Sequence, residues 1–380
     1  MCIRDRREAA ERHMDLRMHG DGTKDGMREV VEATRAEFAA LIGAHPDEIA
    51  LTKNVSEGLN HIAGAMDWKE GDNVVVCAEL EHPNNVYLWL NLREHDGVEV
   101  RVVPAEEGRI PVEAMVAAVD VRTRILTVPS VTFSPGFITD LAPLSQVCRA
   151  NDVLFLVDGA QSVGVLETDV KAQGIDALAV ATQKGLMSFY GQGFLYCDEA
   201  WASRLRPAYL ARFGVDLGTD AHETAQDLGE LRFQPGARRF DLGNYNYLGA
   251  AAAGASIELL RTLGMAQVEA HCRGLARRLA EGFREIDLPL PDGMPGPDQA
   301  HIVAVGRTGG GRHYSADDPA MNDLHAFLSE RGVRFSIRRG ILRFSLHIWN
   351  TEEEVERVVG MCREWALRGN AAEGTAAQKT

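Results

Sequence analysis

Short apolar runs alternate with amphipathic segments over about the first two thirds of the chain. Between residues 27 and 245, the segments that separate these runs have apolar positions every three or four residues. Short apolar runs are typical of strands buried on both faces, and the segments between them are typical of helices that cover a parallel sheet. We therefore predict a doubly wound α/β domain with a mainly parallel sheet over residues 27–245. Its predicted strands are Glu48–Thr52, Asn73–Ala78, Val98–Val103, Ile125–Val128, Val153–Val157 and Ala177–Val180.

The pattern changes after Gly243 and predicts a smaller α+β domain over residues 246–368. A closing helix is expected over Thr351–Leu367, because Thr351 and Glu354 have the spacing of a capping box at its start. Two long helices precede it, followed by a strand, a further helix and two adjacent strands. These elements are predicted at 247–264, 266–285, 301–305, about 318–331, Val333–Ile337 and Ile341–Leu346.

The two ends of the chain have weaker patterns. Residues 1–26 are rich in arginine and glutamate with little helical periodicity, so we expect a solvated N-terminal arm rather than a docked element. Residues 369–380 (GNAAEGTAAQKT) are small and polar, which is typical of a disordered tail. No apolar run approaches the ~18–20 residues that cross a bilayer, and the charged start is unlike a signal peptide. No membrane partner is predicted.

Composition narrows the class of protein. The 380 residues include 40 Lys plus Arg and 55 Asp plus Glu, which gives a formal net charge of -15. Such an acidic excess repels phosphate backbones, so no nucleic-acid partner is expected, and a small anion would need dedicated local groups. The 6 cysteines show no CxxC spacing. They are typical of reduced thiols, which predicts a cytoplasmic protein.

Four polar motifs follow predicted strands, and ligands of open α/β sheets bind at the carboxyl ends of strands. In TKNVSEGLN, Ser56 is expected to cap a helix whose N-terminus suits a phosphate. VLFLVDGAQSVG delivers Asp158 to the end of a strand, and ATQKG places Lys184 after the next strand. A lysine in a desolvated pocket can form a Schiff base. In ELEHPNN, His82 could lay its ring flat on an aromatic cofactor.

Each motif alone has a structural interpretation that is more common. A helix cap, a solvated lysine or a surface histidine would explain the residues one by one. Together they supply an amine, a carboxylate for a cationic ring nitrogen, a stacking ring and a phosphate cup. This combination is the binding pattern of pyridoxal phosphate, an aldehyde cofactor with a pyridine ring and a phosphate.

The same motifs carry a family resemblance. VDGAQSVG followed by TQKG, with LTKNVSEGLN and EHPNN upstream and RFSLHIWNTEEEV downstream, resembles the class V aminotransferase family of fold-type I pyridoxal-phosphate enzymes. That family includes cysteine desulfurases, isopenicillin N epimerase-like proteins and the alanine–glyoxylate and serine–glyoxylate aminotransferases. The resemblance runs from about residue 27 to 366. It implies pyridoxal 5'-phosphate as the cofactor, an amino-acid substrate, and a homodimer with active sites at the subunit interface.

The resemblance also assigns the residues around the cofactor ring. Lys184 matches the Schiff-base lysine, and Asp158 matches the partner of the pyridinium nitrogen. Gln161 matches the residue that hydrogen-bonds the ring hydroxyl, and His82 matches the ring-stacking histidine. The implied catalytic residues are therefore Lys184, Asp158 and His82.

Further residues are implied to bind anionic groups. Val55 and Ser56 fall where family members bind the phosphate through backbone amides and a hydroxyl. Gln183 can donate a hydrogen bond to the phosphate, and Asn244 stands where many members supply a threonine across the dimer interface. Arg343 matches the arginine that binds the substrate α-carboxylate, for which a bidentate guanidinium is suited.

Departures from the family pattern bear on the reaction. Desulfurases carry a nucleophilic cysteine shortly before the carboxylate-binding arginine, but this chain has no cysteine between His301 and Arg343, so persulfide-forming desulfuration is not expected. Gln183 replaces a histidine found in desulfurases and resembles the alanine–glyoxylate group. An Asn-Ala element that lines the substrate pocket in family members is not found in residues 1–26, so we expect this arm to be incomplete.

The predicted function is an aminotransferase that acts on an amino acid through an aldimine with Lys184. An epimerase, racemase or β-lyase on the same scaffold is the alternative among enzymes. A catalytically inactive fold that only binds a partner is a further hypothesis. It is disfavoured because the chain retains all four residues that match the contacts to the cofactor ring: Lys184, Asp158, Gln161 and His82. A metal hydrolase is disfavoured because the sequence contains no HExxH motif or comparable ligand spacing.

Overall fold

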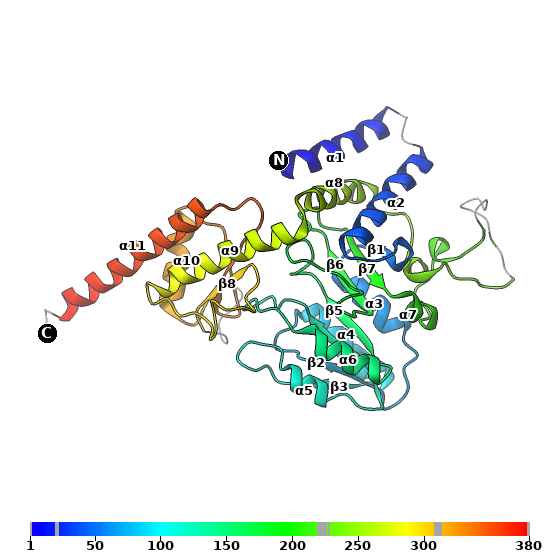
Figure 1. Cartoon of the computed structure of the whole chain (residues 1–380), viewed down its shortest axis with the longest axis horizontal. Coiled ribbons are helices and arrows are strands. Elements are labelled where there is room, and N and C mark those ends of the chain that lie inside the picture. Colours follow the sequence, from blue (N-terminus) through cyan, green and yellow to red (C-terminus); the bar gives the residue numbers. More distant parts are fainter. Residues whose placement is uncertain (1, 20–22, 219–225, 227–228, 308–313, 378–380) are drawn as a thin grey trace. The chain divides into compact units, whose positions relative to one another are not determined.

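The computed structural model describes residues 2–19, 23–218, 226, 229–307 and 314–377 (Figure 1). The chain forms two compact units. The first comprises Met1–Pro104, Ile110–Ser130 and Asp140–Met265, and the second comprises Ala105–Arg109, Val131–Thr139 and Ala266–Thr380. The boundary lies at Met265 and not at the predicted residue 245, because helix α8 (Tyr247–Leu263) packs on helix α2 (Lys24–Leu41) of the first unit.

A seven-stranded sheet forms the centre of the first unit, in the order β1-β7-β6-β5-β4-β2-β3. Strands β2 to β6 pair in parallel, whereas β7 runs antiparallel to both of its neighbours. This confirms the predicted mainly parallel α/β fold. The strands are β1 (Ile49–Thr52), β2 (Asn73–Val76), β3 (Glu99–Val102), β4 (Thr123–Pro129), β5 (Leu154–Asp158), β6 (Ala177–Ala181) and β7 (Gly193–Cys197).

Strand β7 is the element of this sheet that the sequence analysis missed. It is only five residues long and lies between β1 and β6, so its place depends on pairing with strands distant in sequence. The helices of the first unit follow the predicted β-α alternation. They include α3 (Val55–Ala65), α4 (Tyr87–Asp96), α5 (Val112–Ala117), α6 (Leu141–Ala150) and α7 (Glu199–Arg204), with short 3-10 helices such as η2 (Pro83–Asn85) between them.

The N-terminal arm is docked, which corrects the expectation of a solvated segment. Helix α1 (Cys2–Met18) lies beside α8 in the first unit (Figure 1). Ala9 and Ala10 of α1 are buried, and α8 presents small residues along YLGAAAAGAS. Small side chains allow two helices to approach closely, and this interhelical packing leaves no strong apolar stripe in the sequence of α1.

The second unit contains a three-stranded antiparallel sheet in the order β8-β10-β9. Its helices pack on one face, where Val303, Val305, Leu342 and Phe344 belong to the core. The elements are helix α9 (Met265–Arg284), strand β8 (Ile302–Val305), helix α10 (Pro319–Glu330), strand β9 (Ser336–Arg338), strand β10 (Ile341–Ser345) and helix α11 (Glu352–Ala377).

The start of α11 is as predicted, but its end is not. Thr351 Oγ1 accepts a hydrogen bond from the Glu354 N–H at 3.3 Å, and Glu354 Oε2 accepts one from the Thr351 N–H at 3.2 Å, which confirms the capping box. The helix continues to Ala377, where the sequence analysis predicted a disordered tail from residue 369. Alanine is frequent in this stretch and has the highest helix propensity. Residues 378–380 lie outside the described residues.

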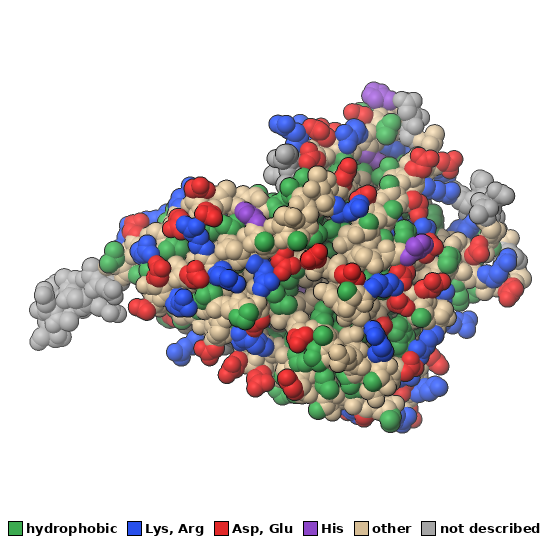
Figure 2. All heavy atoms as spheres, in the orientation of Figure 1, with side chains coloured by type: hydrophobic (Ala, Val, Ile, Leu, Met, Phe, Trp, Pro, Cys, Tyr) green, Lys and Arg blue, Asp and Glu red, His purple; other side chains and the backbone are tan. Residues whose placement is uncertain are grey.

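Charges on the surface are mixed in sign. On the face drawn in Figure 2, acidic and basic side chains are interspersed, so the net charge of -15 does not gather there into one field. Within the described residues, no helix combines the length and the apolar character needed to span a membrane.

Candidate active site

The fold brings the sequence motifs to one edge of the large sheet. Strands β2, β4, β5 and β6 are parallel, and β1 has the same direction because it pairs antiparallel with β7, which itself pairs antiparallel with β6. The motifs follow β1, β2, β5 and β6, so their residues begin at the same, carboxyl-terminal edge. This is the edge at which open α/β sheets bind ligands.

Asp158 and Lys184 lie within electrostatic reach of each other. Asp158 ends β5, is 5% exposed, and accepts a hydrogen bond at Oδ1 from the Ala160 N–H at 2.8 Å. Burial raises the pKa of Asp158, while the positive charge of Lys184 and the Ala160 hydrogen bond act in the opposite direction. Lys184 is an exposed residue on the turn after β6, the strand that pairs with β5. The structure thus places an amine beside a buried carboxylate.

Two glycines allow the loops that carry these residues to touch. Gly164, on the loop after Asp158, has a φ of +91°, and a Cβ atom there would lie 2.5 Å from the Gly185 carbonyl oxygen. A Cβ atom on Gly185 would collide with the Val163 carbonyl oxygen. The backbone next to Lys184 is therefore fixed by a close approach that only glycine permits.

Replacing Gly164 with alanine is expected to displace the Lys184 turn. The strained φ alone costs about 1–3 kcal/mol, and the collision with Gly185 adds to it. Gly97→Ala is a matched control, because Gly97 also has a positive φ (+67°), but a Cβ there would meet open space within 4 Å. We expect both variants to lower the urea midpoint, but only Gly164→Ala to weaken cofactor binding. Equal cofactor affinity in the two variants would contradict this role.

The N-terminus of α3 has free donor groups. Asn54 is the N-cap: its Oδ1 accepts a hydrogen bond from the Glu57 N–H at 2.9 Å. This corrects the prediction that Ser56 caps the helix, because Asn54 has the extended conformation of a cap while Ser56 is already helical. The N–H groups of Val55 and Ser56 precede any intrahelical acceptor, so they and the Ser56 hydroxyl can face an anion.

His82 is held by the turn that follows β2. Its Nδ1 accepts a hydrogen bond from the Asn84 N–H at 3.2 Å, which makes it the N-cap of η2. Asn85 connects this turn to the sheet. Its side-chain Nδ2 donates to Thr127 Oγ1 of β4 at 2.8 Å, and its side-chain Oδ1 accepts from the Trp89 indole N–H at 3.2 Å. The orientation of the imidazole is thus set by local hydrogen bonds.

Three further predicted residues are polar groups near this edge. Gln161 lies in the turn after β5, and Gln183 directly precedes Lys184. The Oε1 atom of Gln183 is buried and has no hydrogen-bond partner within the described part of the chain, so this amide can turn to a ligand. Asn244 is exposed and lines a cavity of about 300 Å³ together with Thr52, at the end of β1.

Arg343 belongs to the second unit. It lies on β10 opposite Ser336 of β9, on the face of the sheet away from the core. Burial and the neighbouring charge of Arg338 lower the pKa of Arg343 to about 10. His301, also buried, has its pKa lowered to about 3 by burial and by the charges of Arg343 and His347. A partly buried guanidinium with basic neighbours favours an anionic ligand.

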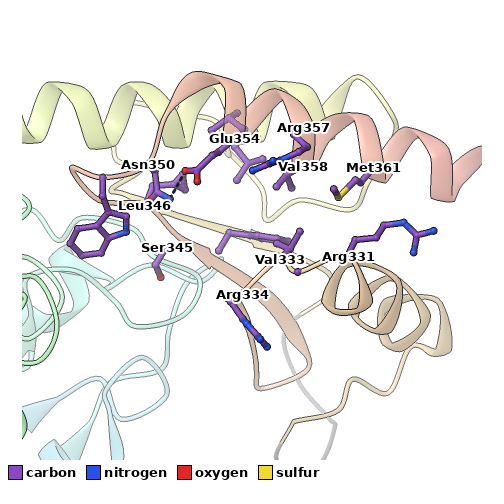
Figure 3. A pocket seen from close by; sticks show the side chains of 15 residues that line it. Arg331, Val333, Arg334, Ser345, Leu346, Asn350, Glu354, Arg357, Val358 and Met361 are labelled. Atoms are coloured by element: carbon purple, nitrogen blue, oxygen red, sulfur yellow. Dashed lines mark hydrogen bonds between the residues drawn. The ribbon is translucent and has the colours of Figure 1, made fainter. Parts of the chain in front are cut away.

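A cavity in the second unit involves none of the predicted site residues. It has a volume of about 520 Å³ and lies in the second unit against α11 and the end of β10 (Figure 3). Leu346, Val355 and Val358 are among its apolar lining residues, and the lining residues Asn350 and Glu354 are hydrogen-bonded to each other at 3.1 Å. Arg331 and Arg334 stand at its rim and point away from the cavity.

One buried acid escaped the sequence analysis. Glu81 is fully buried beside the site, although glutamate is rarely found in a protein interior. Burial raises the pKa of Glu81 well above its usual range, the negative charge of Asp158 raises it further, and the Asn85 amide offsets part of this shift. Glu79 and His82 beside it in the sequence are also polar, so the sequence carries no signal that separates the buried Glu81 from a solvated glutamate.

The residues of the first unit fit a pyridoxal-phosphate cofactor. An amine lies beside a buried carboxylate, and a helix N-terminus offers N–H groups that can donate to a phosphate. With the doubly wound sheet, these features define a pyridoxal-phosphate-dependent enzyme of fold type I. The chain belongs to the class-V aminotransferase family, whose family model matches residues 17–358. Pyridoxal 5'-phosphate is the cofactor of this family.

The similar proteins are named either as cysteine desulfurases or as aminotransferases. A protein of Methanothermobacter thermautotrophicus named "Probable cysteine desulfurase" is 33% identical over 348 residues, which cover 87% of this chain and 82% of the relative. A Bacillus subtilis protein named "Uncharacterized aminotransferase YcbU" is 28% identical over 331 residues, with coverage of 87% and 82%. The apo structure of a cysteine desulfurase from Thermococcus onnurineus has a TM-score of 0.80 at 24% identity, covering 96% of this chain and 91% of that one.

Proposed function

We propose that this protein is an aminotransferase that moves the amino group of an amino acid to a 2-oxo acid. The observation that carries the proposal is the placement of Lys184 beside Asp158 on adjacent strand ends, with Gln183 directly before the lysine. A glutamine at this position resembles the alanine–glyoxylate aminotransferases, and one of the relatives is named as an aminotransferase.

Each residue has a proposed task in this reaction. When bound, the cofactor supplies an electron-withdrawing ring that stabilises negative charge at the substrate α-carbon. Asp158 keeps the ring nitrogen protonated, because a buried carboxylate stabilises an adjacent positive charge. Lys184 anchors the cofactor and then removes and returns the α-proton as a general base and acid. Arg343 is the proposed ligand of the substrate carboxylate, as the resemblance implies and its burial supports.

The remaining groups orient and retain the cofactor. His82 is proposed to stack on the ring, because its imidazole is already fixed by the Asn84 N–H. Gln161 is proposed to hydrogen-bond the ring hydroxyl. The N–H groups of Val55 and Ser56, with the Gln183 amide, are proposed to hold the phosphate, where the helix dipole favours negative charge.

Carbon–sulfur bond cleavage is the second candidate. Relatives named as cysteine desulfurases favour it, as does the fold of a cystine C–S lyase, which matches with a TM-score of 0.81. A protein-bound persulfide is disfavoured at the cysteines whose side chains the structure describes, because all five are buried free thiols. Burial raises the pKa of all five, for example to about 11 at Cys77 and to about 12 at Cys272 and Cys362, so they stay protonated at neutral pH.

A homodimer is part of the proposal. Phe189 and Tyr190, on the loop after Lys184, are 42% and 83% exposed, and exposed aromatic side chains are enriched at protein interfaces. The next residues of this loop line the same cavity as Asn244, the proposed contact to a partner's phosphate. Light scattering coupled to size-exclusion chromatography should give a mass of twice 41.6 kDa. A monomer that still binds the cofactor would refute the shared site.

A panel of amino acids, each tested with and without a 2-oxo acid, separates the candidates. We expect amino-group transfer that stops when the acceptor is omitted, because the amino group then stays on the enzyme. Elimination would release a 2-oxo acid and ammonia without an acceptor, and racemisation would invert the amino acid without one. Chromatographic analysis of both products and of amino-acid configuration distinguishes the three. Acceptor-independent release of sulfide from cysteine, or of cysteine persulfide from cystine, would instead support the lyase.

A further inference from the structure

Two buried carboxyl groups lie close together beneath the proposed cofactor site. Glu81 is 0% exposed and Asp158 is 5% exposed. The charge of Asp158 acts on Glu81 across the ends of β2 and β5, which flank β4 in the sheet. Neither carboxylate oxygen of Glu81 has a hydrogen-bond donor in ordinary geometry among the described residues. The proposed reaction gives Glu81 no task.

Only one of these two groups can be ionised at neutral pH. Two like charges in a dry site repel each other, and each also loses its hydration on burial. Asp158 has the features that stabilise a carboxylate: the Ala160 N–H donates to it at 2.8 Å, and the charge of Lys184 is nearby. Among the described residues, the Asn85 amide lies beside Glu81 without donating to it in ordinary geometry, and the negative charge of Asp158 opposes the ionisation of Glu81. Glu81 is therefore the group that retains its proton.

The surroundings of Glu81 connect it to the residues that would touch the cofactor. It directly precedes His82, whose ring is fixed at the start of η2. Asn85, its amide neighbour, hydrogen-bonds Thr127 on β4, and Pro129 at the end of the same strand pairs with Asp158. One compact group of side chains thus supports both the stacking histidine and the ring-nitrogen carboxylate.

We propose that Glu81 is a positioning residue of the cofactor site: it stays protonated, so that the buried pair carries one negative charge, on Asp158, and its neutral carboxyl group supports the turn that presents His82. This inference rests on the proposed function. If Glu81 were also ionised, its negative charge would favour protonation of Asp158. Otherwise the ring nitrogen would lie near two negative charges. A neutral Glu81 leaves Asp158 as the single counter-charge.

The first test uses the cofactor-free protein and the variant Glu81→Gln. A carboxyl group that keeps its proton in the folded state but loses it on unfolding makes folding weaker as the pH rises above about 4.3, its unfolded pKa. The folding equilibrium constant of the native sequence should therefore contain a component that falls by up to tenfold per pH unit as the pH rises above about 5. Glutamine cannot release a proton, so this component should vanish. Urea titrations at several pH values measure it.

Glu79→Gln is the matched control for this test. Glu79 is an exposed glutamate two residues earlier in the same segment. Its replacement should leave the pH dependence of the native protein unchanged. If Glu81→Gln also leaves that dependence unchanged, Glu81 is ionised in the folded protein and the proposal is overturned.

The second test asks whether the neutral group positions the site. Glu81→Gln should bind pyridoxal 5'-phosphate within about twofold of the native protein and keep the same pH midpoint of cofactor absorbance. Glu81→Leu is also uncharged but places no polar group beside the Asn85 amide, and we expect its cofactor affinity to fall at least tenfold. Rescue by glutamine but not leucine supports positioning. Native affinity in both variants, or a midpoint shifted by a pH unit in Glu81→Gln, would overturn it.

The two tests separate failure of the inference from failure of the proposed function. If the native protein does not bind pyridoxal 5'-phosphate, the proposed function fails and the positioning role falls with it, while the urea titrations still report whether Glu81 holds a proton. If the native protein binds the cofactor and Glu81→Leu binds equally well, the proposed function stands and only the inference is refuted.

Discussion

Replacement of Lys184 by alanine is expected to lower turnover by roughly 10²- to 10⁴-fold, because the variant loses the general base that moves the α-proton. It should also lose the absorbance that arises when the cofactor is joined to the lysine. The fold should be preserved, since Lys184 is exposed and its turn is fixed by Gly164 and Gly185. Absorbance spectra and steady-state rates of the purified, cofactor-loaded variant test both expectations.

The matched control for this variant is Lys69→Ala. Lys69 is another exposed lysine of the first unit, and it lies before β2 at the opposite end of that strand from the motif residues. We expect native spectra and rates from this control. A Lys184→Ala protein with an unchanged cofactor spectrum would refute the assignment of the Schiff-base lysine.

Removal of the Arg35 guanidinium should cause the largest loss of stability. Arg35 on α2 is 0% exposed and forms an ion pair with Asp241, which is 2% exposed, at 2.8 Å. Asp241 also accepts hydrogen bonds from the Leu51 N–H and the Tyr245 hydroxyl, both at 2.9 Å. Arg35→Met would leave a buried carboxylate without its counter-charge, which costs about 3–5 kcal/mol of unfolding free energy. Urea titration followed by tryptophan fluorescence measures this cost.

Two further variants make this prediction specific. The double variant Arg35→Met with Asp241→Asn removes both charges, so it should recover a large part of the lost stability. Arg278→Met breaks exposed ion pairs with Glu352 and Glu356 and should cost less than about 1 kcal/mol. Equal losses from Arg35→Met and Arg278→Met would show that the buried pair contributes no more than a surface pair.

The candidate site could be predicted where its residues belong to local motifs. Asp158 and Lys184 each follow an apolar run, and their separation by one strand is visible in the sequence. Their electrostatic contact then follows from the pairing of β5 with β6. The helix cap could not be assigned in the same way. Asn54 and Ser56 are both good capping residues, and only the backbone conformation shows that Asn54 is the cap.

The sequence by itself determined the β-α alternation, the capping box of α11 and the order of the motifs. These features depend on periodicity and on residues within a few positions of one another. Tertiary structure alone decided the insertion of β7 between β1 and β6, the docking of α1 on α8, and the burial of Glu81 beside Asp158. Each of these depends on contacts between segments distant in sequence, and whether a polar side chain is buried or solvated is set by those contacts.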